Sequence, residues 1–162
     1  MRIRFTVELA CPSDAAWAAL HSPAAVAELY GPVFRLTGLD PLPERFSDGS
    51  RVRVRLALLG LVPLGSQLIA IADVLPDGPV GPDGPAARTM RDAGRPLTGP
   101  MALISRWRHE MTVLPVPGDP DRSIWRDELT IGGAAAPLLW PALALVWRWR
   151  RARIRRLSRS WR

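Results

Sequence analysis

The first ten residues alternate between apolar and polar side chains. The apolar positions are Ile3, Phe5, Val7 and Leu9, and the polar positions between them are Arg2, Arg4, Thr6 and Glu8. A period of two residues is that of a β-strand with one buried face, because successive side chains of a strand point to opposite sides. Such a strand needs partners on its edges and a layer over its apolar face. We therefore expect the rest of the chain to supply a sheet and an element that covers it.

The remaining pattern predicts two short helices, a run of strands and one long helix. The short helices are predicted over residues 13–20 and 22–30, and Gly31 with Pro32 ends the second. Extended segments bounded by Gly, Pro or Asp are predicted at 33–39, 50–59, 66–75, 88–91, 101–114 and 123–131. Turns or loops are predicted at 76–85, 94–100 and 115–121, and the long helix is predicted from about 134–137 onward. Strands without intervening helices favour an antiparallel sheet, so the predicted class is α+β.

Length and residue content favour one domain without a metal or cofactor. A chain of 162 residues with no repeat and no linker is expected to form a single domain over residues 1–162. One cysteine, Cys11, excludes an internal disulfide and a multi-cysteine metal site, and His21 and His109 lack metal-ligand spacing. No glycine-rich nucleotide motif is present. The lone cysteine and the absence of a signal-peptide pattern predict a cytoplasmic protein, with association to a membrane surface as an alternative.

The positive charge of the chain is confined to its C-terminal end. All 22 basic residues are arginine, against 15 acidic residues, which gives a net charge of +7. Residues 148–162 hold eight of the arginines and no acid, so residues 1–147 carry 14 − 15 = −1. This distribution argues against a generally basic, nucleic-acid-binding body, and nucleic acid is not expected as a partner.

Arginine and tryptophan together mark the end of the predicted helix. The segment 134–147 is strongly apolar but spans 14 residues with two prolines, whereas a membrane-spanning helix needs about 20. Two interpretations remain for the basic end. In the first, its arginines face water or pair with acids such as Glu8, Glu110 and Glu128. In the second, they contact an anionic membrane surface. The residues that would make the membrane contact are Arg148, Arg150, Arg151, Arg153, Arg155 and Arg156.

Two predicted strands each carry one polar residue on an apolar face. His109 shares its face with Trp107, Met111 and Val113, and Asp127 shares its face with Trp125 and two aliphatic residues. If the two strands pair as a hairpin, His109 and Asp127 lie on the same inner surface. A carboxylate beside a histidine fixes its tautomer and stabilises its charged form, which suits a general acid or base or a ligand clamp. The alternative is that the two residues only satisfy each other inside the fold.

The long helix and the sheet are expected to enclose a ligand pocket. The apolar stripe of the helix recurs at three- and four-residue steps and would lie on a curved sheet. A space between them that side chains do not fill would take a mainly apolar molecule oriented by a few polar groups. The residues expected to line that pocket are Trp17, Tyr30, Trp107, His109, Met111, Trp125, Asp127, Leu143 and Trp147.

Four segments together form a pattern known from other proteins: FTVELACPSDAAWAAL (5–20), SPAAVAELYGP (22–32), RWRHEMTVLP (106–115) and WRDELTI (125–131), the last leading into the final helix. In these segments the chain resembles the SRPBCC superfamily, which includes START, Bet v 1-like and polyketide cyclase/dehydrase-like domains. The resemblance covers nearly the whole chain and implies a helix-grip fold, in which about seven antiparallel strands wrap around the C-terminal helix. The ending WRWRRARIRRLSRSWR (147–162) is more basic than the family helix would suggest.

Three functions are consistent with these features. The leading hypothesis is a binding protein for a small hydrophobic molecule, lipid-like or polyketide-like, held between sheet and helix. A second hypothesis is a cyclase or dehydratase type of enzyme that uses His109 with Asp127 as general acid and base. A third is a peripheral membrane or interaction protein that acts through the arginine- and tryptophan-rich helix.

Overall fold

The computed structural model describes residues 1–74 and 87–161. The predicted loop at 76–85 lies outside the described residues. The first half of the chain forms β1 (Arg2–Leu9), α1 (Ser13–Leu20), α2 (Pro23–Tyr30), β2 (Phe34–Gly38), β3 (Arg51–Leu58) and β4 (Val62–Val74). The second half forms β5 (Arg88–Asp92), β6 (Arg95–Pro96), η1 (Pro100–Leu103), β7 (Arg106–Val116), β8 (Asp119–Gly132), α3 (Ala136–Leu157) and η2 (Ser158–Ser160).

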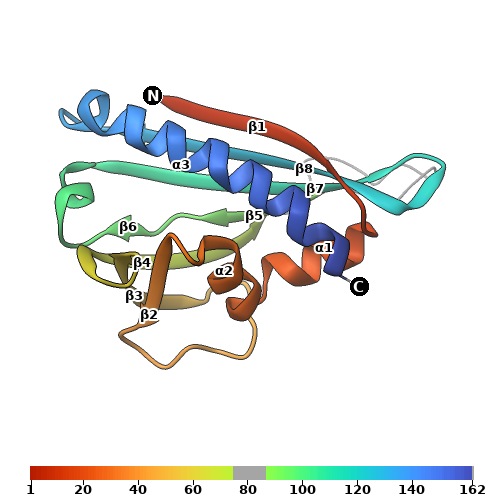
Figure 1. Cartoon of the computed structure of the whole chain (residues 1–162), viewed down its shortest axis with the longest axis horizontal. Coiled ribbons are helices and arrows are strands. Elements are labelled where there is room, and N and C mark those ends of the chain that lie inside the picture. Colours follow the sequence, from red (N-terminus) through yellow and green to blue (C-terminus); the bar gives the residue numbers. More distant parts are fainter. Residues whose placement is uncertain (75–86, 162) are drawn as a thin grey trace.

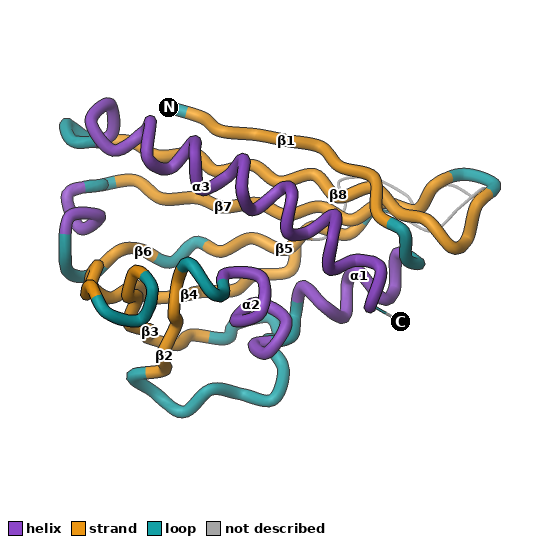
Figure 2. Tube along the Cα trace, in the orientation of Figure 1, coloured by secondary structure: helices purple, strands orange, loops and turns teal. Residues whose placement is uncertain are grey.

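The strands form one antiparallel sheet that carries α3 across one face (Figure 1). The strand order is β1-β8-β7-β5-β4-β3-β2, and the two-residue strand β6 pairs with β4. The two short helices lie between β1 and β2 in the chain and cover the end of the sheet near the C-terminus of α3 (Figure 2). The predicted α+β class, the strand count of about seven and the covering C-terminal helix are confirmed.

Several predicted boundaries differ because of tight turns. The strand predicted at 66–75 begins earlier, at Val62, since Leu59 and Gly60 adopt left-handed conformations and turn the chain sharply after β3. The strand predicted at 101–114 was wrong at its start, where Pro100–Leu103 forms a 3-10 turn and β7 begins only at Arg106. Gly99, with a φ of 78°, makes this turn, and a Cβ there would lie 2.1 Å from the Leu64 carbonyl oxygen.

The β7–β8 hairpin is longer than the sequence predicts. A turn was expected over 115–121, but β7 runs to Val116 and β8 starts at Asp119, so only Pro117 and Gly118 connect them. Gly118 has a φ of 78°, a conformation that glycine adopts without strain. The long hairpin fixes the register of the two strands that carry His109 and Asp127.

The core consists of two apolar clusters. One lies among α1, α2, the C-terminal half of α3 and the middle of the sheet, and includes Ala16, Trp125 and Ile154; Cys11 is part of it, as a small buried side chain. The other lies under the first half of α3 around Leu143 and Trp147. The residues of α3 that face the sheet recur at three- and four-residue steps, as predicted. No helix in the described part of the chain combines the length and apolar character that a membrane span requires.

Candidate functional site

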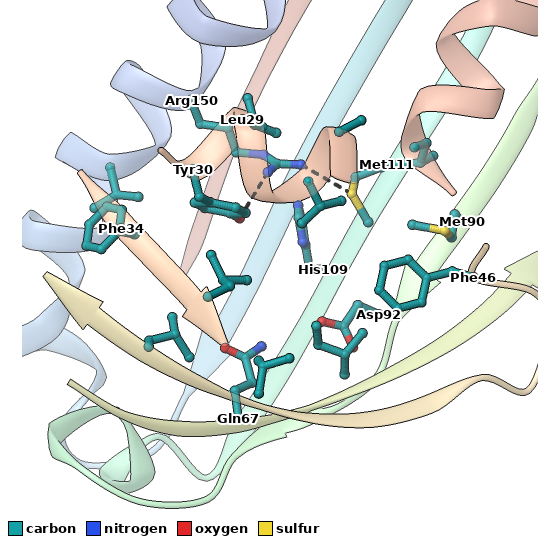
Figure 3. Close-up of a pocket in the computed structure, with 18 of the residues that line it drawn as sticks. Leu29, Tyr30, Phe34, Phe46, Gln67, Met90, Asp92, His109, Met111 and Arg150 are labelled. Carbon is teal, nitrogen blue, oxygen red and sulfur yellow. Dashed lines mark hydrogen bonds between the residues drawn. The ribbon is translucent and has the colours of Figure 1, made fainter. Parts of the chain in front are cut away.

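A pocket lies between α3, α2 and the inner face of the sheet. Its volume is about 160 Å³. Figure 3 shows that side chains from α3 and α2 close it on one side and side chains from the strands on the other. Its walls are mostly aliphatic and aromatic, and the polar side chains among its lining are Tyr30, Gln67, Asp92, His109 and Arg150.

Asp127 is the centre of a buried hydrogen-bond network behind the pocket. Its side chain is fully buried, and its two carboxylate oxygens contact four polar groups. Oδ1 accepts from the indole nitrogen of Trp147 at 2.8 Å and lies 2.8 Å from Nε2 of His109. Oδ2 accepts from Arg150 Nε at 2.9 Å and from the indole nitrogen of Trp125 at 3.2 Å. Burial opposes ionisation, but the Arg150 and His109 contacts outweigh it and hold the pKa of Asp127 below its ordinary value.

Arg150 connects this network to the helix α2. It is 3% exposed and comes from the sheet-facing side of α3, between Trp147 and Ile154. Its Nη1 donates to the Tyr30 hydroxyl at 2.9 Å, and its Nη2 lies 3.4 Å from the sulfur of Met111 (Figure 3). Burial raises the pKa of Tyr30, although the Arg150 charge opposes this shift.

Two expectations about the arginines of the helix are therefore corrected. Arg150 was named among the arginines of a possible membrane contact, but it is buried and paired with Asp127, because its position on the helix falls within the apolar stripe. The acids expected to pair with the helix arginines lie on the outer face of the sheet and pair elsewhere. Their partners are Arg122 for Glu8, Arg91 and Arg108 for Glu110, and Arg2 for Glu128.

His109 is held in place by Asp127, as predicted, and borders the pocket. Its ring lies edge-on to Trp147, with the ring centroids 5.2 Å apart. A neutral imidazole that turns Nε2 toward a carboxylate carries its proton there, which leaves Nδ1 as a hydrogen-bond acceptor. His109 can thus accept a hydrogen bond, or a proton, from a molecule in the pocket.

Asp92 is a functional candidate that the sequence analysis missed. It ends β5 directly opposite His109 in the β5–β7 ladder, and it lines the same pocket. Its Oδ1 accepts from the backbone N–H groups of Ala70 and Gly94, each at 2.9 Å. Desolvation by burial raises the pKa of Asp92 despite these bonds. The two buried aspartates differ in that the guanidinium of Arg150 contacts Asp127 and not Asp92.

Local structure around Gly94 explains how Asp92 is oriented. A Cβ at Gly94 would lie 1.9 Å from the Leu68 carbonyl oxygen and 2.8 Å from Oδ1 of Asp92. Only glycine allows the chain to pass this close to β4. The Asp-Ala-Gly sequence at the end of a short strand was a weak signal for this arrangement, because the strand register could not be known.

The structure brings together most of the residues that were expected to bind a ligand. Those that line the pocket are Tyr30, Trp107, His109, Met111, Trp125, Leu143 and Trp147. Asp127 lies behind them, without a carboxylate oxygen free for a ligand. Trp17 is not part of the lining: it packs on the first core cluster and lies under the guanidinium group of Arg88, 5.2 Å from it. The polar lining residues that sequence reasoning missed are Gln67, Asp92 and Arg150.

The site combines a compensated charge pair with nearly neutral polar groups. Asp127 and Arg150 balance each other, and the raised pKa of Asp92 favours an uncharged carboxyl. Across residues 1–74 and 87–161, no group of three or more His, Cys, Asp or Glu side chains is arranged to hold a metal ion. The arrangement can accept and donate hydrogen bonds inside an apolar enclosure.

Solved structures with the same architecture are known, although no protein-family model and no curated protein sequence matches this chain. A protein of Chromobacterium violaceum is 14% identical, with a TM-score of 0.69 over 98% of this chain and 96% of that chain. Norcoclaurine synthase of Thalictrum, solved as a point mutant with a transition-state analogue, is 13% identical, with a TM-score of 0.58 over 98% and 93%. The Zhui aromatase/cyclase of a Streptomyces species is 15% identical, with a TM-score of 0.59 over 98% and 93%.

Similarity at such low identity concerns the fold, and it agrees with the strand order and helix placement described above. It does not show that this chain shares the activities of these proteins. The structural similarities show that this chain has the same helix-grip fold as these proteins, the fold that the resemblance in its sequence implied.

Proposed function

We propose that this protein binds a small, mainly apolar molecule in the pocket beneath α3. The observation that carries the proposal is an unfilled space of about 160 Å³ whose walls are apolar and whose polar atoms are few. Protein interiors are normally packed as densely as organic crystals, and an unfilled apolar space lowers stability. A ligand that fills the space would recover those contacts.

The volume limits the size of the ligand. An engineered cavity of about 150 Å³ is large enough for benzene, so this pocket has room for roughly one six-membered ring with small substituents. Typical ligand pockets measure about 300–1,000 Å³. A lipid chain or a fused polyketide would require the walls to move apart.

The polar atoms of the pocket favour an uncharged ligand that carries oxygen. His109 offers an acceptor at Nδ1, and Gln67 offers both a donor and an acceptor. Among the described residues, the partner of Arg150 Nη2 is the sulfur of Met111, which is a weak acceptor. A carbonyl or hydroxyl oxygen of a ligand would be a stronger acceptor for this group. Because Asp127 already neutralises Arg150, a charged ligand group would lack a counter-ion.

Cavity filling tests this proposal directly. The variant Leu36→Trp would place an indole in the pocket that Leu36 lines, while Leu42→Trp adds the same side chain at an exposed site as the control. The probes are p-cresol and cyclohexanone, and the readout is the shift of the unfolding temperature with probe concentration. Binding to the folded state stabilises it by RT ln(1 + [L]/Kd), about 2.7 kcal/mol at 100 times Kd.

We expect both probes to stabilise the wild-type protein and the Leu42→Trp control, but not Leu36→Trp. Native mass spectrometry after mild purification should detect a bound molecule in the same two proteins. Equal stabilisation of all three proteins would place the binding elsewhere, and no stabilisation of any would refute a ring-sized pocket.

Catalysis is a second candidate function, favoured by the position of Asp92 opposite His109. Asp127 has no oxygen free to touch a substrate, so its role would be to position His109. In a dehydration, His109 Nδ1 would take a proton from the carbon next to a carbonyl. The carboxyl of Asp92 would give a proton to the departing hydroxyl, which leaves as water. Arg150 Nη2 would stabilise the enolate oxygen.

A small β-hydroxy ketone, diacetone alcohol, provides the test for this second candidate. Its dehydration to mesityl oxide is followed by ultraviolet absorbance. The prediction is turnover by the wild type that disappears in Asp92→Asn and in His109→Ala. Turnover that survives in either variant would remove that residue from the reaction, and none in the wild type would leave ligand binding as the better account.

A further inference from the structure

One end of the molecule exposes large apolar side chains from three separate segments. These are the turn between β3 and β4, the 3-10 turn η1 and the start of α3, which lie at the same end, on the left of Figure 1. We call this the leucine end, and its exposed residues are Leu59 (62%), Leu61 (83%), Val62 (55%), Leu103 (66%) and Leu138 (80%). Exposed apolar groups that gather in one region mark interaction surfaces.

Packing contacts place the three segments beside one another. The backbone N–H of Leu97, just before η1, donates to the carbonyl oxygen of Ser66 in β4. Met101, within η1, belongs to the same apolar cluster as Ala136 and Trp140 of α3. The leucine end is therefore one continuous region of the folded protein.

The leucine end contains no acidic residue. Residues 55–69, 93–107 and 132–149 include neither Asp nor Glu. Three exposed arginines border the region: Arg35, whose side chain lies beside Gly60, Arg95 and Arg106. Within the part of the chain that the structure describes, none of the three takes part in an ion pair. This combination fits a partner that is apolar inside and negatively charged at its surface.

The leucine end also adjoins the pocket. Leu64 in β4 and Met101 in η1 line the pocket, and each is two residues from an exposed member of the leucine end, Val62 and Leu103. A molecule that leaves an apolar phase at this end would have a short path to the pocket.

We propose that the leucine end docks on an anionic lipid bilayer. Leu59, Leu61, Leu103 and Leu138 enter the boundary between headgroups and acyl chains, while the bordering arginines contact lipid phosphates. A second copy of the chain fits less well, because pairing two such ends would bring unpaired arginines together. This site differs from the basic end of α3, where the exposed residues are arginines rather than leucines.

Vesicle sedimentation tests the proposal without any pocket ligand. The vesicles contain phosphatidylcholine alone or an equal mixture with phosphatidylglycerol. The variants are Leu61→Asp and Leu138→Asp at the leucine end. The matched control is Leu42→Asp, since Leu42 is also exposed but lies in the loop after β2. Far-ultraviolet circular dichroism confirms that each variant is folded.

The expected result is that the wild type and Leu42→Asp sediment with the anionic vesicles and less with the neutral ones. Each leucine-end variant should lower the partition coefficient about tenfold or more, since a charged side chain would have to enter the acyl boundary. Added salt should weaken the binding, because it screens the arginines.

Three results would overturn the proposal. The first is no sedimentation of the wild type. The second is binding that survives Leu61→Asp and Leu138→Asp but is lost when Arg151 and Arg155 are changed to Glu, which would place the contact on the basic end of α3. The third is a variant-sensitive dimer in solution without vesicle binding. None of these outcomes depends on whether the pocket holds a ligand, so the two proposals fail separately.

Discussion

Asp127 and Asp92 are two buried aspartates on the inner face of the same sheet, and their ionisation differs. Asp127 contacts the guanidinium of Arg150 and the ring of His109, and its pKa is lowered. Asp92 is held by two backbone N–H groups without a cation in contact, and its pKa is raised. Desolvation by burial opposes the ionisation of both. The comparison indicates that two backbone N–H groups do not offset the desolvation of Asp92, whereas the contacts of Asp127 with Arg150 and His109 do offset its desolvation.

Replacing Asp127 should produce the largest effect on stability. The variant Asp127→Asn removes the charge that neutralises Arg150, and arginine cannot give up its proton to compensate. In either orientation the amide group also deprives Trp125 or Trp147 of its acceptor. We expect a loss of about 5 kcal/mol in the free energy of unfolding, measured by urea denaturation.

A second substitution makes this prediction more specific. Adding Arg150→Met to Asp127→Asn removes the uncompensated cation, so the double variant should be more stable than Asp127→Asn alone. A double variant less stable than either single variant would mean that the charge pair does not explain the loss.

Replacing Arg150 alone should have the next largest effect. In Arg150→Met the carboxylate of Asp127 loses its cation, but it can take up a proton, so the expected loss is about 3 kcal/mol. With the His109 contact left but the guanidinium gone, the pKa of Asp127 would rise toward that of a desolvated carboxyl, and stability would fall as the pH rises above about 4. Urea denaturation at several pH values measures this. The control is Arg151→Met at the exposed neighbouring position, which should change little.

Replacing Asp92 should raise stability at high pH, in contrast to the losses expected from replacing Asp127 or Arg150. A raised pKa means that the folded protein holds its proton more tightly than the unfolded chain. This contribution is therefore fully present below a pH of about 4 and is lost as the pH rises through the folded pKa. Asp92→Asn keeps an oxygen for the Ala70 and Gly94 N–H groups and cannot ionise. The variant should gain stability over the wild type at pH 8 and show no gain at pH 4. A loss at pH 8 would show that a charged Asp92 stabilises the fold.

The smallest effect is expected from a surface pair with the same chemistry. The side chain of Arg53 makes three hydrogen bonds to Asp40 and lowers the pKa of Asp40 to about 2. Water reaches both side chains, which are 57% and 31% exposed, so Arg53→Gln should leave the urea midpoint at pH 7 almost unchanged. The lowered pKa stabilises only above about pH 4 and is lost as the pH falls toward 2, so the variant should denature slightly less steeply in acid. A large change at pH 7 would contradict the distinction between buried and exposed pairs.

The alternation of apolar and polar residues along the strands was enough to predict that His109 and Asp127 lie together. His109 and Asp127 fall on apolar faces of two strands joined by a short turn, and the hairpin brings the two side chains within 2.8 Å of each other. The antiparallel character of the sheet followed from the absence of helices between the predicted strands. These inferences use only neighbouring segments, where periodicity carries the information.

The remaining polar residues of the site, Asp92 and Arg150, are placed by contacts between segments that are far apart in the sequence. Asp92 faces the pocket only because of how β5 pairs with β4 and β7, and no local pattern specifies that register. Arg150 could have been found, since Trp147, Arg150, Ile154 and Leu157 follow helical spacing on one face. It was interpreted as part of the exposed basic end because seven other arginines surround it.

The pairing of β1 with β8 has a consequence for how the chain folds. Arg2 pairs with Thr130, so the first strand has no partner until about 130 residues have been synthesised, and the closure of such a long loop is slow. Even then, Asp127 lies on the newly formed β8 without its cation, because Arg150 follows later on α3. The arrival of α3 both covers the sheet and neutralises the aspartate within it. During synthesis β1 therefore lacks its partner strand until β8 has emerged, and Asp127 lacks its cation until α3 follows.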